Sequence, residues 1–290
     1  MGHKSKKSLV RQVQEALQSK LSAGDSKHMD KRNHETGEKI YSYNTFRTYQ
    51  KHSCAFVKWA QQEHGCKTLD ECRQHVDEYL QHRATYCSAY TVKLDAASIG
   101  KTYGESTRNF IHTPSRLRSE ITRSRGEKAM DKHFSETKNA DLVAFCRSTG
   151  LRRSELKACT GNSLVQCSDS PVGFGIYVKS GKGGKERIAP LYCDRTTANR
   201  IVDMCRAAGS GKVFSSVSKA CDVHGYRSEY AAAVYKANAI PLEKLQRPEK
   251  YYCRNDKVGT VYCRHGMQIC SQALGHNRID VISSNYLHSI

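Results

Sequence analysis

The stretch FGIYVKSGKGGKERIAPL, residues 174–191, places two short apolar segments on either side of a glycine-rich turn. Residues 174–180 and 186–191 have the β-branched, aromatic and other apolar residues that are typical of strands. The GKGGK sequence between them supplies the glycines that tight turns require. The stretch therefore predicts an antiparallel hairpin whose turn presents two lysines, Lys182 and Lys185.

Helical patterns surround this hairpin on both sides. Before it, residues 141–147 predict a helix that stops at Gly150, and a further helix begins at Leu151. After it come the predicted helices, at 196–208, 225–239, 265–274 and around Tyr286, and a second hairpin at 251–263. We therefore predict a mostly α fold with a small antiparallel β-sheet, in a domain that spans residues 135–290.

The N-terminal half predicts a separate helical domain at residues 40–111. Apolar residues at helical spacing mark a helix at 44–60, and Thr68 with Glu71 forms a capping-box pattern that opens another. A third helix, with a less clear apolar stripe, is predicted at 88–103. Residues 1–39 precede this domain as a basic helix, 8–21, and a polar segment, 22–39, that predicts a loop. The basic helix fits two roles equally, an accessory DNA-binding element or a packing helix.

The charge balance indicates a polyanionic partner. The chain has 47 Lys and Arg against 28 Asp and Glu, a net charge of +19 and a pI near 9.4, with basic residues spread from end to end. Such a surface is typical of proteins that bind nucleic acid. The sequence has no long apolar run and no secretory signal, so we expect a cytoplasmic, nucleoid-associated protein with no membrane partner.

The thirteen cysteines are odd in number and scattered, and they form no Cys-x-x-Cys pair. This pattern favours reduced, mostly buried thiols over a disulfide scaffold. Cys263, His265 and Cys270 lack the second properly spaced pair that a structural zinc site needs, so no metal is predicted.

Residues 112–134 are polar and basic and predict a linker between the two domains. They include Arg123 and Arg125. A run of charge is usually a solvated segment, but positive charge at flexible reach also suits contacts with DNA phosphates. Arg123 and Arg125 are therefore candidate DNA contacts, as is Lys185 of the hairpin turn.

Four short motifs in the C-terminal domain indicate a function only when they are considered together and in order. They are STGLRRSEL (148–156), the GKGGKER hairpin, HGYRSEYAAAVY (224–235) and LGHNRIDVISSNY (274–286). Each alone has an ordinary structural explanation, because capped helices and glycine turns are common. Together they provide an arginine, a hairpin lysine, a His-x-x-Arg pair, a histidine and a tyrosine, which is the set that nucleophilic phosphoryl transfer on DNA needs.

The ordered set resembles the tyrosine recombinase (integrase) family, over residues 137–290, and the upstream helical segment is similar in position to the family's core-binding domain. The resemblance implies a two-domain architecture, no cofactor and no ATP. It also implies a catalytic set, which comprises Arg152, Lys182, His224, Arg227, His276 and Tyr286.

The implied roles follow the chemistry of a phosphodiester. Arg152 and Arg227 suit the charge that grows on its non-bridging oxygens, with His276 as a further donor. Tyr286 is the nucleophile of a 3′-phosphotyrosyl intermediate, and Lys182 protonates the leaving 5′-oxygen. His224 accepts or orients the phenolic proton. Glu155 either steadies Arg152 or is an ordinary surface carboxylate.

The His-x-x-Arg motif has a second possible match. The segment from Tyr251 to Arg254 lies at the family's usual distance from LGH, with tyrosine in place of histidine. We prefer His224 and Arg227 because both residue types are correct, which makes residues 240–264 an insertion. In that interpretation Arg254 and Lys257 are candidate DNA contacts.

The sequence thus predicts a site-specific recombinase or integrase of a mobile genetic element that acts on double-stranded DNA as a homo-tetramer, with accessory DNA-bending proteins as possible partners. A type IB topoisomerase and a non-catalytic DNA-binding regulator are the alternatives.

Two features depart from the family pattern. Tyr286 follows His276 by ten residues where nine is commoner, which predicts a kinked local helix, and four residues follow Tyr286.

Overall fold

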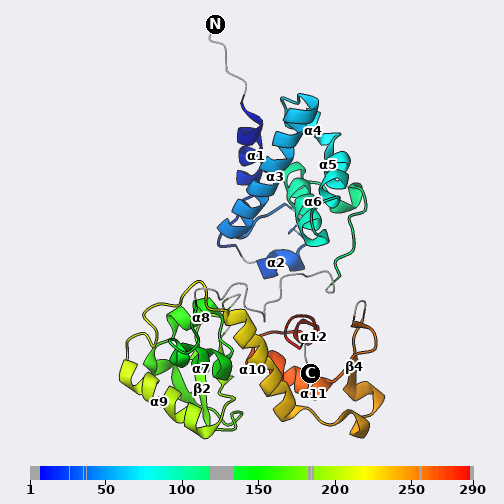
Figure 1. The fold of residues 1–290 in the computed structure, drawn as a ribbon. Coiled ribbons are helices and arrows are strands. Elements are labelled where there is room, and N and C mark those ends of the chain that lie inside the picture. The colour runs from blue at the N-terminus through cyan, green and yellow to red at the C-terminus, as the bar shows by residue number, and fades with distance from the viewer. Residues whose placement is uncertain are drawn as a thin grey trace. The chain divides into compact units, whose positions relative to one another are not determined.

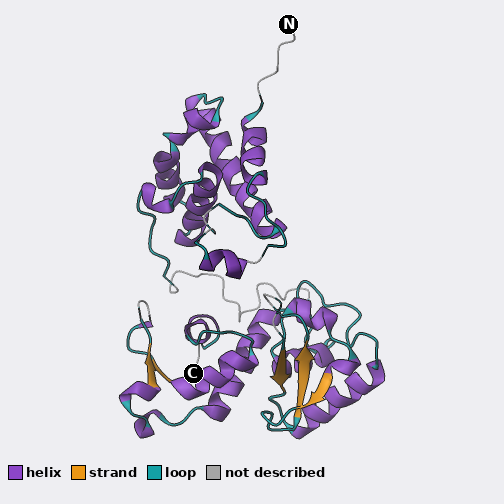
Figure 2. Cartoon of the chain, turned by 180° about the vertical axis from the view of Figure 1, so that it is seen from behind, coloured by secondary structure: helices purple, strands orange, loops and turns teal. Residues whose placement is uncertain are grey.

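The computed structural model describes residues 7–25, 27–34, 36, 38–117, 134–181, 184, 186–254 and 257–287 of the chain. The chain divides into two compact units, Met1–Ile121 and Thr122–Ile290. Figures 1 and 2 show that helices dominate both units and that the strands belong to the second. The predicted mostly α fold with small antiparallel sheets is therefore confirmed. No helix among the described residues is both long and apolar enough to cross a membrane.

The first unit is a helical bundle. Its helices are α1 (Leu9–Gln18), α2 (Lys27–Arg32), α3 (Tyr43–His64), α4 (Leu69–Arg73), α5 (Val76–Ala84) and α6 (Ala89–Tyr103), followed by the 3₁₀ turn η1 (Thr107–Asn109). Helix α1 buries Leu9, Val13 and Leu17 in the same core as α3 and α6, so the structure assigns it the packing role. The capping box predicted at Thr68 and Glu71 is present at the start of α4.

The polar segment 22–39 was predicted as a loop, and this was wrong in part, because α2 lies within it. The Asp30 carboxylate in α2 binds Lys39 Nζ at 3.1 Å and Tyr41 Oη at 2.8 Å. Two partners from the following segment thus stabilise a six-residue helix whose own sequence has no apolar stripe. Tertiary contacts of this kind are not visible in local sequence.

The second unit contains the remaining elements. Its helices are α7 (Ala140–Thr149), α8 (Arg153–Ala158), α9 (Arg195–Ala208), α10 (Val223–Asn238), α11 (Arg264–Ala273) and α12 (Asp280–Asn285), and its 3₁₀ turns are η2 (Gly161–Ser163), η3 (Leu242–Lys244) and η4 (Arg247–Glu249). Its strands are β1 (Leu164–Gln166), β2 (Phe174–Val178), β3 (Arg187–Pro190), β4 (Lys250–Tyr252) and β5 (Val261–Cys263).

Both predicted hairpins are present in this unit. Strands β1, β2 and β3 form an antiparallel sheet in that order, and Tyr177 pairs with Ile188 across β2 and β3. Strands β4 and β5 pair separately, with Tyr251 opposite Tyr262. Strand β1 was not predicted, because three residues are too few for an alternating pattern to show.

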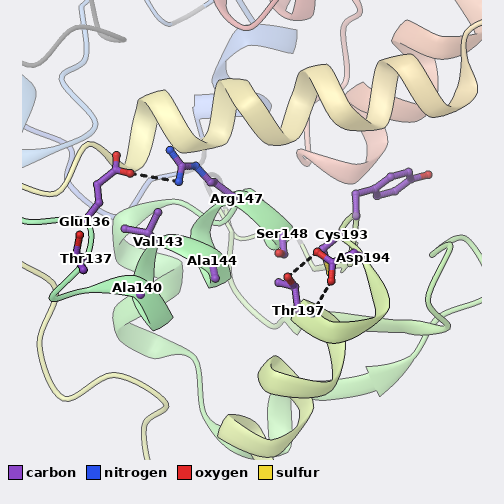
Figure 3. A pocket seen from close by; sticks show the side chains of 11 residues that line it. Glu136, Thr137, Ala140, Val143, Ala144, Arg147, Ser148, Cys193, Asp194 and Thr197 are labelled. Carbon is purple, nitrogen blue, oxygen red and sulfur yellow. Dashed lines mark hydrogen bonds and ion pairs between the residues drawn. The ribbon is translucent and has the colours of Figure 1, made fainter.

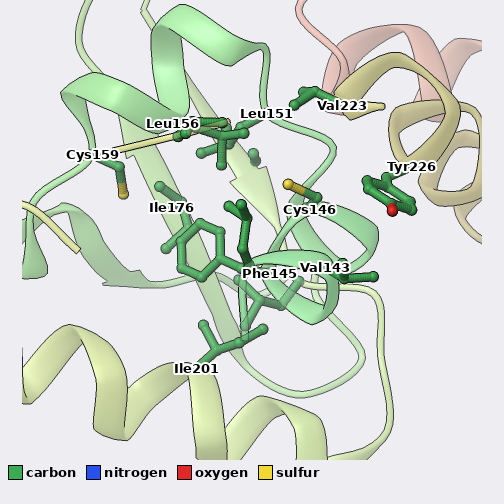
Figure 4. Close-up of a cluster of buried hydrophobic side chains, with 14 of the residues drawn as sticks. Val143, Phe145, Cys146, Leu151, Leu156, Cys159, Ile176, Ile201, Val223 and Tyr226 are labelled. Atoms are coloured by element: carbon green, nitrogen blue, oxygen red, sulfur yellow. The ribbon is translucent and has the colours of Figure 1, made fainter. Parts of the chain in front are cut away.

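Two clusters of buried side chains stabilise the unit, and α10 contributes to both. The first surrounds the sheet, where Phe145 of α7 packs with Ile176 and Ile201 (Figure 4). The second contains Tyr230 of α10 with Met267 of α11. In Figure 1, α10 runs between the sheet and α11. A side chain on α10 can therefore reach groups that belong to either cluster.

Candidate active site

The structure describes five of the six predicted catalytic residues: Arg152, His224, Arg227, His276 and Tyr286. Lys182 lies outside the described residues, and so do Lys185, Arg123 and Arg125. Of the five, Arg152, Arg227, His276 and Tyr286 converge around one point, although they come from the start of α8, from α10, from the turn after α11 and from the end of α12.

A tight turn between α7 and α8 determines the position of Arg152. Gly150 ends α7 with a φ of 58°, a left-handed conformation that favours glycine, and Arg152 is the N-cap residue of α8. The backbone N–H of Arg152 donates to Glu155 Oε2, and its guanidinium donates to Glu155 Oε1, both at 2.8 Å. The neighbouring Arg153 donates to the backbone carbonyls of Val217 and Ser218 instead, so Arg152 is the arginine of the cluster.

Glu155 is buried, which excludes the interpretation of this residue as an ordinary surface carboxylate. It accepts a bidentate pair from Arg187 of β3, at 3.0 Å and 2.8 Å, in addition to the bonds from Arg152. Burial alone would raise the pKa of Glu155, but the hydrogen bonds and charge of Arg187, with help from Arg152, lower it to about 2. Glu155 is therefore a carboxylate at neutral pH and holds two guanidinium groups.

Arg227 is the most deeply placed cation of the cluster, with 1% of its surface exposed. Its guanidinium donates to the backbone carbonyl of Leu274 at 2.6 Å, to that of Gly150, and through Nε to the Tyr286 hydroxyl at 3.2 Å. Burial lowers the pKa of Arg227, but an arginine stays protonated in proteins. The hydrogen bond from Arg227 Nε therefore places a buried positive charge beside the Tyr286 oxygen.

The LGH turn brings His276 against both arginines. Gly275 has a φ of 67°, and a Cβ at this position would lie 2.8 Å from Arg187 Cδ, so only glycine fits. His276 Nε2 lies 3.5 Å from Arg152, 3.4 Å from Arg227 and 3.2 Å from the Tyr286 hydroxyl. Because all of these neighbours can donate, they favour the tautomer in which Nε2 accepts.

Tyr286 lies directly after α12, with φ −130° and ψ −34°, outside helical geometry. The predicted kink therefore takes the form of a helix end before the tyrosine. Tyr286 has 7% of its surface exposed, and the next residue, Leu287, is fully buried. The Arg227 guanidinium also lies 5.4 Å from the centre of the Tyr286 ring. The end of the described chain is thus packed into the unit.

His224 and the alternative arginine lie in different surroundings. His224 is in the first turn of α10 with an exposed side chain, and the histidine at the Tyr286 hydroxyl is His276. Arg254 is exposed beside the β4–β5 turn. The Tyr251 ring lies 5.7 Å from the Arg264 guanidinium. The arginine that reaches Tyr286 in this structure is therefore Arg227.

Lys257 was predicted as a DNA contact, but its ammonium donates to two backbone carbonyls of its own chain, those of Ser283 and Leu287. These carbonyls flank Tyr286 in the sequence. The structure thus gives Lys257 an intramolecular partner at the end of α12.

Sequence reasoning missed Arg187, which is the second partner of Glu155. Strand alternation carries the signal, because residues two apart in a strand face the same side. Ala189 is fully buried and Ile188 is 43% exposed, so position 187 faces inward with Ala189. An arginine at an inward position needs a buried carboxylate, and Glu155 provides it.

One group among the described residues has the composition of a metal site, and it lies in the first unit: His64, His75 and Glu78. The two imidazole rings stack with centroids 3.7 Å apart and an angle of 9° between their planes. His64 Nε2 and His75 Nδ1 lie 3.1 Å and 3.5 Å from the same carboxylate oxygen of Glu78. In the described structure the group is a carboxylate shared by two histidines, outside the cluster around Tyr286.

A pocket of about 480 Å³ lies between α7 and α9 (Figure 3). Its charged groups are already paired within the protein, Arg147 with Glu136 at 3.3 Å and Asp194 with the backbone of Thr197 at 2.8 Å. None of the converging catalytic candidates lines this pocket. It therefore lies apart from the cluster around Tyr286.

No protein-family model matches the chain, and no curated protein matches it. Among solved structures it is similar to the Tn1549 transposon integrase (residues 82–397) in complex with circular intermediate DNA, at 11% identity over 96% of each chain and a TM-score of 0.47. It is similar to the XerH site-specific recombinase bound to difH substrate, at 14% identity over 97% of this chain and 92% of that chain, with a TM-score of 0.46. It is also similar to XerA recombinase, at 15% identity over 89% of this chain and 92% of that chain, with a TM-score of 0.34. All three are described as recombinases or integrases.

Proposed function

We propose that the chain is a tyrosine site-specific recombinase, an integrase that cuts and rejoins DNA strands through a covalent 3′-phosphotyrosyl intermediate. The observation that carries the proposal is the position of the Tyr286 hydroxyl, 3.2 Å from both Arg227 Nε and His276 Nε2. The imidazole is within hydrogen-bond reach of the phenolic proton and can act as its general base, which leaves the oxygen to act as a nucleophile.

The arginines suit the remainder of the reaction. Attack by the phenol oxygen on a DNA phosphate increases the negative charge on the two non-bridging oxygens. Arg152 and Arg227 both contact the Leu274 carbonyl and both approach His276, so their guanidinium groups share one small region beside Tyr286. Glu155 and Arg187 fix the orientation of Arg152. Preorganised donors of this kind stabilise the transition state without rearranging when the charge develops.

Proton transfer is assigned to three further groups. In the described geometry His276 accepts the phenolic proton, and His224 is the second candidate for this role, from the first turn of α10. Lys182, which lies between β2 and β3 in the sequence, protonates the 5′-oxygen that leaves. The phosphotyrosyl bond keeps the energy of the broken phosphodiester, so a 5′-hydroxyl can reverse the reaction without ATP.

The proposed partner is double-stranded DNA, bound by a homo-tetramer on two synapsed sites in the cytoplasm, with accessory DNA-bending proteins where the site requires them. The net charge of +19 supports binding to the phosphate backbone. A mobile genetic element is the expected origin of the DNA that such an enzyme integrates or excises.

Covalent trapping tests the proposal. The substrate is a pool of nicked duplexes with randomised sequence around the nick, so that no single target sequence has to be chosen. The unchanged protein should form a covalent adduct that survives denaturing electrophoresis, and Tyr286→Phe should form none. Tyr252→Phe, which alters an exposed tyrosine of β4, is the matched control and should retain the adduct. An adduct that persists in Tyr286→Phe would exclude Tyr286 as the nucleophile.

A second pair of variants tests the choice between the two His-x-x-Arg matches. Arg227→Ala should slow adduct formation by roughly a hundredfold or more, because it removes a transition-state donor. Arg254→Ala should mainly weaken DNA binding, because Arg254 is exposed. Thermal melting of both variants separates loss of folding from loss of catalysis. If Arg254→Ala abolishes cleavage while binding persists, the second match is the correct one.

A further inference from the structure

The β4–β5 hairpin reaches the segment that carries Tyr286. Lys257, in the turn of this hairpin, donates from Nζ to the Ser283 carbonyl at 2.5 Å and to the Leu287 carbonyl at 3.0 Å. One ammonium group therefore bridges the residues on either side of Tyr286. In Figure 1 the hairpin and α12 belong to the same C-terminal part of the second unit.

The geometry at the end of α12 explains why these carbonyls need a donor. In a continuing helix the N–H of Leu287 would donate to the Ser283 carbonyl, four residues earlier. Here the N–H groups of Tyr286 and Leu287 both donate to the Ile282 carbonyl, at 3.0 Å and 3.1 Å. The Ser283 carbonyl thus loses its helical donor, and Lys257 replaces it. A cation at a helix C-terminus also interacts favourably with the helix dipole.

A second side chain of the hairpin binds the same backbone. The hydroxyl of Tyr262, in β5, donates to the Leu287 carbonyl at 3.1 Å and is buried. Leu287 itself belongs to one cluster of buried side chains together with Leu245 and Cys253, which come from the segment between α10 and β5. Polar and apolar contacts thus attach the residue after the proposed nucleophile to residues 240–264.

We infer that Lys257 and Tyr262 of the insertion form a clamp in cis, in which Lys257 is a positioning residue that holds Tyr286 within reach of Arg227 and His276. The inference rests on the proposed function of Tyr286, and it assigns to the insertion a role in placing the nucleophile. It differs from the role predicted for Lys257 in the sequence, a contact with DNA phosphate. A clamp affects the rate of cleavage, whereas a phosphate contact affects the affinity for DNA and its salt dependence.

Lys257→Met keeps most of the side chain and removes its charge and donors. We expect it to slow adduct formation on the nicked duplex pool by about tenfold, which corresponds to about 1.4 kcal/mol in the barrier. The DNA dissociation constant should remain within about twofold of that of the unchanged protein. Lys257→Arg should restore part of the rate, and Tyr262→Phe should reduce it less than Lys257→Met. Lys244→Met, an exposed lysine of the same segment, is the matched control and should leave both quantities unchanged.

Amide hydrogen exchange of residues 280–287, measured without DNA, tests the clamp independently of the chemistry. Exchange in this segment should accelerate in Lys257→Met and remain unchanged in Lys244→Met. If exchange and rate are both unaffected while the affinity for DNA falls, Lys257 is a phosphate contact and the clamp is wrong. If the unchanged protein forms no adduct although exchange responds to Lys257→Met, the clamp stands and the proposed function fails.

Mixing two variants tests whether the clamp acts within one chain. In a mixture of Lys257→Met and Tyr286→Phe, each remaining Tyr286 belongs to a chain without Lys257. A clamp in cis predicts that the mixture cleaves no faster per active tyrosine than Lys257→Met alone. A rate restored toward that of the unchanged protein would mean that Lys257 of one subunit holds Tyr286 of another, and would overturn the inference.

Discussion

At the residue scale, the cluster depends on one carboxylate shared by two arginines. Glu155 and Arg187 expose 2% and 7% of their side chains, and Arg152 exposes 16%. A guanidinium buried to this degree needs a partner, because removal from water costs several kcal/mol per ion. The loss of Arg187 therefore affects Arg152 as well, through the carboxylate that both contact.

Arg187→Met should reduce the free energy of unfolding by about 3–5 kcal/mol, because it leaves the Glu155 carboxylate short of a buried partner. Urea unfolding checks this value. Arg200→Met is a matched control, since Arg200 forms an exposed pair with Asp141 and should cost less than about 1 kcal/mol. The double variant Arg187→Met/Glu155→Leu should lose less free energy of unfolding than the two single variants lose together. Strict additivity would contradict the shared-carboxylate description.

The pKa of Glu155 predicts a pH dependence of stability. Arg187 and Arg152 hold the folded-state pKa at about 2, against an ordinary value of 4.5, so the carboxylate favours the folded state above pH 4.5. This contribution, roughly 3 kcal/mol, is lost as the pH falls from about 4.5 to about 2. The difference in unfolding free energy between the unchanged protein and Glu155→Gln should therefore shrink over this range. A difference that stays constant from pH 7 to pH 3 would contradict it.

At the element scale, the turn between α7 and α8 places two parts of the site at once. The Gly150 carbonyl accepts from Arg227, and Arg152 follows two residues later. A Cβ at Gly150 would lie 2.2 Å from Tyr230 Cδ1 on α10, the helix that carries Arg227. The separation of α7 and α10 at this point therefore depends on the absence of a side chain.

Gly150→Ala should reduce the free energy of unfolding by roughly 3 kcal/mol or more, because left-handed strain adds to the clash with Tyr230. Gly173→Ala provides the comparison, since Gly173 also has a positive φ, 82°, but no atom lies within 4 Å of the added Cβ. It should cost only about 1–2 kcal/mol. Chemical denaturation of the two variants measures the difference, and equal losses would exclude the clash.

The sequence predicted those elements whose signal is local. The capping box at Thr68, the stop at Gly150 and the two hairpins are confirmed because turns and caps depend on few neighbouring residues. The order of the motifs predicted that Arg152, Arg227, His276 and Tyr286 share one site, but it gave no distances or contacts between them. Arg187 was missed because its role depends on a carboxylate 32 residues away, and the intramolecular partners of Lys257 were missed for the same reason. Contacts between distant residues have no local pattern to reveal them.

At the scale of the whole molecule, positive charge is present in both units. Residues Met1–Ile121 contain 20 Lys and Arg against 13 Asp and Glu, and Thr122–Ile290 contain 27 against 15. Both units can therefore contribute contacts with DNA phosphates, and each contact releases counterions on binding. Affinity for DNA should depend strongly on salt.

Binding to a random-sequence duplex should weaken by about 10³–10⁵ between 50 and 200 mM salt if roughly 6–10 phosphates are contacted. Fluorescence anisotropy across this range gives the slope. The isolated residues 122–290 should show a smaller slope than the whole chain, because the first unit contributes contacts of its own. Equal slopes would mean that the second unit alone contacts the backbone.

Only 7% of the surface of Tyr286 is exposed, and this low exposure limits which DNA phosphates can reach its hydroxyl. A strongly basic protein encounters far more ordinary DNA than target DNA, and each accidental nick would damage its host. The Tyr286 hydroxyl is turned inward against Arg227 and His276, so under the proposed function a DNA phosphate has to come within reach of a buried oxygen before it can be attacked. Those duplexes whose phosphate fits against the buried Tyr286 would then be cut, so the choice of DNA depends on the residue that performs the proposed chemistry.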